Sequence, residues 1–134
     1  MTDGEEFRRV LDVVLCDVRA QCSVRPDVRA AEDGYPGLML YAPDGSGQGV
    51  YWGSDDRPGA RLAEVADQVQ EWAVEALWGE AKSAVWPHCP VHPDSHPLSA
   101  TVVEGVAVWV CAKAPKGAAP VSRVGELPPR GVDA

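Results

Sequence analysis

Histidine and cysteine, side chains that commonly bind transition metals, are concentrated in one short stretch of the chain. All three histidines and two of the four cysteines lie within residues 88–111. Cys89 and His92 are separated by two residues, the spacing with which a tight turn directs two side chains at one metal ion. Eighteen residues lie between His92 and Cys111, and those nearest Cys111 are mostly apolar. Two ligand-bearing limbs at this separation are typical of a zinc site.

Residues 86–111 resemble a zinc-ribbon hairpin, with Cys-Pro-x-His as the first limb and Trp-x-Cys as the second. A more extended pattern includes Gln70-Glu71-Trp72 and Leu77-Trp78, followed by residues 86–97 and 107–111. This pattern resembles small uncharacterised proteins of high-GC actinobacteria. The resemblance covers about half of the chain and implies no known activity.

The fourth ligand is the incomplete part of this pattern. Structural zinc sites are almost always closed by four protein ligands, but Ala114 stands where a ribbon would carry the last one. We therefore predict that His96 supplies the fourth ligand, with His88 as a weaker candidate. The predicted metal ligands are Cys89, His92, His96 and Cys111. If neither histidine binds, two alternatives remain: an open zinc ion that carries water, or a hairpin that packs without metal.

Other catalytic patterns are incomplete in the sequence. A nucleophilic pair of Cys89 with a histidine has no identifiable third group to orient the base. The sequence favours a non-enzymatic adaptor or accessory protein that binds another protein, and exposure of Trp78 and Trp86 would mark its binding patch. The alternative is a small metal-dependent hydrolase in which Cys89, His92 and Cys111 surround an open zinc ion.

Two amphipathic helices are predicted to build the core that positions these residues. Apolar residues recur at spacings of three and four over residues 4–22 and again over residues 59–78. The first helix has Asp17 on its polar face, and Cys16 and Cys22 are expected to be buried small hydrophobic residues. The second helix is expected to expose a row of polar residues: Glu64, Asp67, Gln68, Glu71 and Glu75.

Each helix is followed by a predicted antiparallel hairpin. The predicted strands are residues 38–41 with 50–52, joined by a turn over 43–47, and residues 100–103 with 106–110, joined by Glu104-Gly105. One further edge strand is predicted over 121–124. The order helix, hairpin, helix, hairpin indicates an α+β fold with the helices packed on antiparallel hairpins. We predict one domain over residues 1–126, with 84–113 as its zinc-ribbon-like hairpin and 127–134 as a flexible tail.

Charge and composition restrict the class of partner. The 134 residues are 46% hydrophobic and carry a net charge of −8, as expected for one acidic globular domain. Residues 1–34 and 35–80 carry net charges of −3 and −6, whereas residues 81–134 carry +1 from scattered bases. Because an acidic surface repels phosphate groups, nucleic acid is not an expected partner.

The sequence also carries no expected link to a membrane. No apolar run approaches the roughly 18 residues that span a bilayer, and acids stand where a secretory signal would place lysines. We therefore predict a cytoplasmic protein with reduced cysteines, whose partner is another protein. Its oligomeric state is left open.

Overall fold

The computed structural model describes residues 3–30, 37–52, 57–92, 95–115 and 117–129. Its elements are α1 (Asp3–Gln21), β1 (Asp27–Ala30), β2 (Gly37–Tyr41), β3 (Gly47–Tyr51), α2 (Pro58–Gly79), β4 (Leu98–Val103), β5 (Val106–Cys111) and β6 (Ser122–Arg123). The predicted α+β class is confirmed. Each predicted hairpin is part of a three-stranded antiparallel sheet, in the orders β1-β2-β3 and β4-β5-β6.

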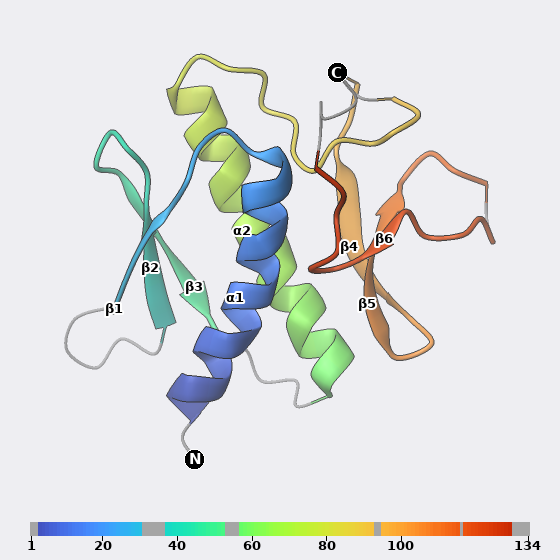
Figure 1. Ribbon diagram of the computed structural model, residues 1–134, viewed down its shortest axis with the longest axis horizontal. Coiled ribbons are helices and arrows are strands. Elements are labelled where there is room, and N and C mark those ends of the chain that lie inside the picture. The colour runs from blue at the N-terminus through green and yellow to red at the C-terminus, as the bar shows by residue number, and fades with distance from the viewer. Residues whose placement is uncertain (1–2, 31–36, 53–56, 93–94, 116, 130–134) are drawn as a thin grey trace.

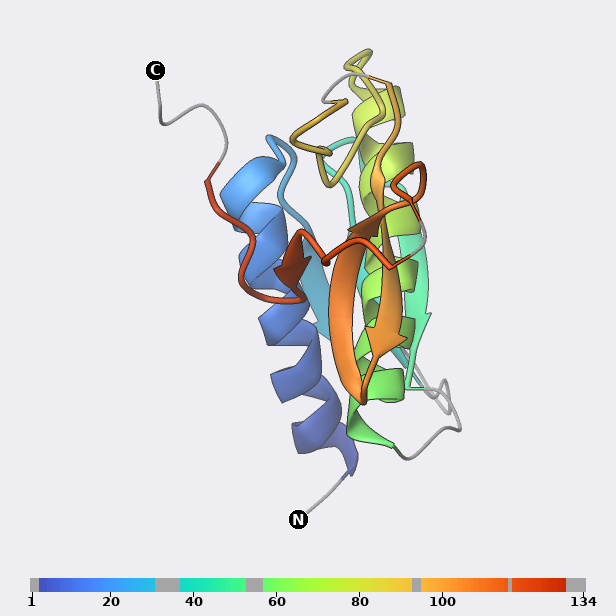
Figure 2. The same cartoon turned by 90° about the vertical axis from the view of Figure 1, so that its right-hand side faces the viewer.

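The two helices lie between the two sheets, so the described chain forms three layers (Figure 1). α2 contacts β3 on one side and β4 and β5 on the other, and Figure 2 shows β4 and β5 covering it. This central position follows from the sequence of α2, whose apolar stripe is wide and rich in small alanines. The buried residues of α2 are Val65, Ala66, Val69, Trp72, Ala73, Ala76 and Leu77.

The polar face of α2 was predicted with one error. Glu64, Asp67, Glu71 and Glu75 are exposed as expected, but Gln68 is half-buried. Its side-chain oxygen accepts a hydrogen bond from the Tyr51 N–H at 2.8 Å, and its side-chain nitrogen donates to the Tyr51 carbonyl at 2.9 Å. Gln68 therefore satisfies backbone groups at the end of β3 instead of facing solvent.

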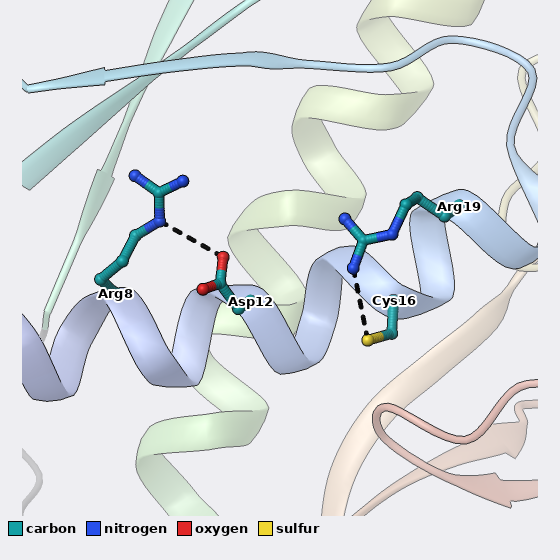
Figure 3. Close-up of polar contacts among 4 residues, drawn as sticks. All are labelled: Arg8, Asp12, Cys16 and Arg19. Atoms are coloured by element: carbon teal, nitrogen blue, oxygen red, sulfur yellow. Dashed lines mark hydrogen bonds and ion pairs between the residues drawn. The ribbon is translucent and has the colours of Figure 1, made fainter.

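α1 buries the apolar stripe that its spacing predicts, but one of its cysteines was wrongly placed. Cys22 is buried as expected, whereas Cys16 is exposed. Cys16 follows the buried Phe7 by nine residues, which in a helix of about 3.6 residues per turn brings it to the opposite side. Figure 3 shows Cys16 on this outer face, where the Arg19 Nη2 donates to its sulfur at 3.5 Å.

Two short strands complete the sheets. β1 was not predicted, because Val28 is its single large apolar residue and it pairs with β2 only at the sheet edge. β6 lies inside the predicted edge strand of residues 121–124 and pairs with β5. Both Glu104 and Gly105, which join β4 to β5, have positive φ angles (50° and 81°), as the tight two-residue hairpin turn requires.

The C-terminal segment contributes to the core. Val124 and Leu127 are buried, although the sequence analysis assigned Leu127 to a flexible tail. Residues 130–134 of that predicted tail lie outside the described residues. Within the described chain, neither helix combines the length and apolar character needed to cross a membrane.

Candidate metal centre

The four predicted ligands lie together at the end of the β4–β5 hairpin that is remote from its turn. One nitrogen or sulfur atom from each of Cys89, His92, His96 and Cys111 lies within 4.8 Å of the others. His92 Nδ1 is 3.0 Å from His96 Nε2 and 3.6 Å from Cys89 Sγ. Cys111 Sγ is 3.8 Å from each of these two histidine nitrogens. These four side chains could hold one metal ion.

The register of the hairpin explains how the distant Cys111 reaches the other three. Cys111 ends β5 and stands opposite Leu98, the first residue of β4. His96 precedes Leu98 by two residues. Cys89 and His92 come from the turn that precedes His96 in the chain. The segment that follows α2, yellow in Figure 1, therefore brings three ligands to the end of β5.

His88, the weaker candidate, does not belong to this cluster in the described chain. It stands opposite Pro97 in an isolated β-bridge, and its backbone N–H donates to Gln21 Oε1 at 3.1 Å. The fourth position of the cluster is occupied by His96 instead.

The environment of Cys89 favours the thiolate, the form that binds metals. Cys89 is completely buried, and burial by itself would raise the pKa of its thiol. Hydrogen bonds to its sulfur from the backbone N–H groups of His92 and Val91, and from the Cys111 thiol, outweigh this effect. The net result is a pKa below the ordinary value of a thiol.

The tautomer of His96 is fixed by a neighbouring carbonyl. His96 Nδ1 lies 3.1 Å from the Pro97 oxygen, which can only accept a hydrogen bond, so Nδ1 carries the proton. The lone pair of Nε2 is then directed at the cluster. A metal-binding histidine commonly donates its second ring N–H to a carbonyl in this way.

Sequence reasoning missed the polar residues that support the site from the helices. Gln70 of α2 donates to the carbonyls of Trp86 (3.1 Å) and Leu98 (2.6 Å), and Gln21 of α1 accepts from His88. Neither glutamine differs in sequence from an ordinary helix-surface residue. The one signal in the sequence was that Gln70 belongs to the extended pattern with Trp72 and Trp78 noted above.

Asp17 was predicted on the polar face of α1, but it is completely buried. Its carboxylate accepts hydrogen bonds from Trp109 Nε1 (2.8 Å), the Gly125 N–H (2.6 Å) and the Leu127 N–H (3.0 Å). Burial raises the pKa of Asp17 above its ordinary value, although these hydrogen bonds act in the opposite direction. Asp17 thus joins α1 to β5 and to the C-terminal segment.

No protein-family model, no curated protein and no solved structure matches the chain. The fold and site define an α+β protein with a candidate four-ligand metal centre. What this centre does must be inferred from its geometry and its donor atoms.

Proposed function

We propose that this chain is a non-enzymatic adaptor or accessory protein that binds another protein and is stabilised by one structural zinc ion. The observation that carries this proposal is the Cys/His cluster, whose four donor atoms lie within 4.8 Å of one another and are as many as a closed tetrahedral zinc site needs. We further propose that the protein is cytoplasmic and that it is related to the small actinobacterial proteins it resembles.

The spacing of the donor atoms supports zinc as the metal. A tetrahedral zinc ion, with Zn–S of about 2.3 Å and Zn–N of about 2.0 Å, separates sulfur from nitrogen by about 3.5 Å and two nitrogens by about 3.3 Å. Three of the four sulfur–nitrogen separations are 3.6, 3.8 and 3.8 Å, the nitrogen–nitrogen separation is 3.0 Å, and all four donor atoms lie within 4.8 Å of one another. These four separations lie within a few tenths of an ångström of the tetrahedral values, and a set of two sulfurs and two imidazoles suits zinc.

The position of His96 favours a structural ion over a catalytic one. Catalytic zinc sites keep a position for water or substrate, and the proposed hydrolase would use only Cys89, His92 and Cys111. His96 Nε2 lies 3.0 Å from His92 Nδ1 and 3.8 Å from Cys111 Sγ, which supports His96 as the fourth ligand. A zinc ion held by all four would connect the segment after α2 to the end of β5.

The protein-binding part of the proposal is supported by exposed apolar side chains. Trp78, in the last turn of α2, is 74% exposed, and Val91, between Cys89 and His92, is 75% exposed. Tryptophan is enriched among the residues that dominate the affinity of protein interfaces. Trp86, predicted as its companion, is completely buried against Trp109, so Trp78 alone of the pair is available to a partner.

Metal analysis of the protein purified without added zinc tests the site directly. We expect close to one zinc ion per chain, and replacement by Co²⁺ should give the intense visible absorption of a tetrahedral Cys/His site. Cys111→Ser should lose the metal, whereas Cys16→Ser should keep it, because Cys16 is exposed on the far side of α1. His96→Ala should weaken zinc retention if the site is closed and leave it unchanged if water is the fourth ligand.

A zinc content near zero in the wild type, with no Co²⁺ spectrum, would refute the metal site. Hydrolytic activity that depends on metal and survives His96→Ala would favour the hydrolase.

Partner binding is tested separately by affinity capture with the wild type and a Trp78→Ser variant. We expect a partner retained by the wild type and released by the variant.

A further inference from the structure

The segment that carries three of the four ligands is closed at its base by backbone contacts. The Leu98 N–H donates to the Pro87 carbonyl at 3.0 Å, and His88 stands opposite Pro97. Cys89, His92 and His96 all lie between these two pairs. The geometry of the ligands therefore depends on how firmly the two ends of the segment are held together.

One side chain outside the segment holds both ends. Gln70 is partly buried in α2, and its side-chain nitrogen donates to the Trp86 carbonyl at 3.1 Å and to the Leu98 carbonyl at 2.6 Å. Trp86 comes before the first ligand and Leu98 comes after the third. A side-chain amide has two N–H donors, so one Gln70 nitrogen satisfies both carbonyls at once.

The position of Gln70 on a rigid helix gives these bonds a further effect. The neighbouring buried residues Val69 and Trp72 fix this part of α2 in the core. A flexible segment loses conformational entropy when a metal orders it, and this loss weakens binding. Contacts that close the segment before the metal arrives remove part of that loss.

We infer that Gln70 is a positioning residue of the metal centre, which closes the ligand-bearing segment so that Cys89, His92 and His96 face Cys111 in advance of the metal. This inference rests on the proposed zinc site. It assigns to α2 a role in metal affinity through a residue that is not itself a metal ligand.

Gln70→Met tests the inference, because methionine has nearly the length of glutamine but no N–H donor. Gln68→Met is the matched control: it is two residues away on the same helix and also loses hydrogen bonds to the backbone, two to Tyr51 and one of 3.4 Å to the Glu64 carbonyl. Zinc affinity is measured on each folded protein by competition with a coloured chelator, well below the melting temperature. The Co²⁺ spectrum reports the geometry of the ligands.

We expect Gln70→Met to weaken zinc binding by about tenfold to a hundredfold, the usual effect of losing an outer support of a metal site, and to alter the Co²⁺ spectrum. Gln68→Met should leave both unchanged. Equal affinities in the two variants would overturn the inference. A wild type that binds no zinc would instead refute the proposed function itself.

Gln70→Asn covers the case in which the methionine variant does not fold. Asparagine keeps the amide but is one methylene shorter, so it cannot reach both carbonyls from the same backbone position. We expect zinc affinity to fall in the same direction. An affinity equal to that of the wild type would again overturn the inference.

Discussion

Replacement of the buried Asp17 gives the most demanding test of how the C-terminal sheet is held to α1. Asp17 is completely buried and accepts three hydrogen bonds, two on Oδ2 and one on Oδ1. Alanine would leave three donors, on Trp109, Gly125 and Leu127, without their acceptor. Asparagine would keep one oxygen but would place an NH₂ group against one of the donors.

The expected losses follow from the cost of an unsatisfied buried donor, about 1–3 kcal/mol each. For Asp17→Asn, which leaves one donor unsatisfied, we expect the free energy of unfolding to fall by about 1–3 kcal/mol. For Asp17→Ala we expect about 3–5 kcal/mol, less than three full penalties because the segment of residues 125–127 can shift toward water.

Urea denaturation followed by tryptophan fluorescence measures these losses, with Asp12→Asn as the control. Asp12 lies on the same helix, is exposed, and pairs with Arg8 at 3.3 Å (Figure 3). An exposed pair of this kind contributes little, so Asp12→Asn should cost less than about 0.5 kcal/mol. If Asp17→Ala cost no more than Asp12→Asn, the assignment of Asp17 as a buried anchor would be wrong.

The pH dependence of Asp17 provides an independent check with a definite sign. The folded pKa of Asp17 is raised above the ordinary value of 3.8, so between the two values the folded state binds more protons than the unfolded state. Its contribution to stability therefore decreases as the pH rises through this interval. Asp17→Asn lacks this titration, so the stability advantage of the wild type should be larger near pH 4 than at pH 7. Because both proteins keep the four metal ligands, metal release cancels in the comparison, and an advantage that shrinks on acidification would contradict the raised pKa.

Three further predictions concern the core and the metal. Trp72→Ala should cost about 3–5 kcal/mol in urea denaturation because it removes a buried aromatic ring, whereas the exposed Glu71→Ala should cost less than about 0.5 kcal/mol. Leu127→Ala should lower the free energy of unfolding by about 2–3 kcal/mol in the same assay, because a buried apolar side chain is lost; an unchanged free energy of unfolding would indicate that residue 127 belongs to the flexible tail. A chelator should lower the melting temperature of the wild type but not of Cys111→Ser, since zinc binding contributes directly to folding; equal melting curves with and without chelator would contradict a structural ion.

The larger elements of the fold could be predicted because their apolar residues repeat with a clear period. The stripe of α2 and the two hairpins were correctly located, and their ends differ from the prediction by up to three residues, the largest difference being the start of β3. β1 could not be found, because a four-residue edge strand with charged residues on both sides of Val28 carries no such period. It forms because β2 offers it a backbone edge, which is a tertiary effect.

The candidate site was predictable in its ligands but not in its supports. Cysteine and histidine are rare enough that their spacing alone brought four of them into one hypothesis, and the structure places all four together. Asp17 and Gln70 are common helix-surface types. Whether such a residue is buried depends on which segment packs beside it, and that information comes from the distant residues of β5 and of the loop before β4.

The Trp-x-Cys limb shows how the core and the candidate metal centre depend on each other. Residues two apart on a strand face the same side, so Trp109 and Cys111 both point toward the layer that contains the helices. The Trp109 ring packs edge-on against the Trp86 ring, with 5.5 Å between the ring centroids, and the Trp109 side-chain N–H donates to Asp17. Trp86 in turn begins the segment that carries Cys89, His92 and His96. β5 therefore meets α1 through Trp109 and the ligand-bearing segment through Cys111, and a metal ion held there would fix the end of this strand at Cys111.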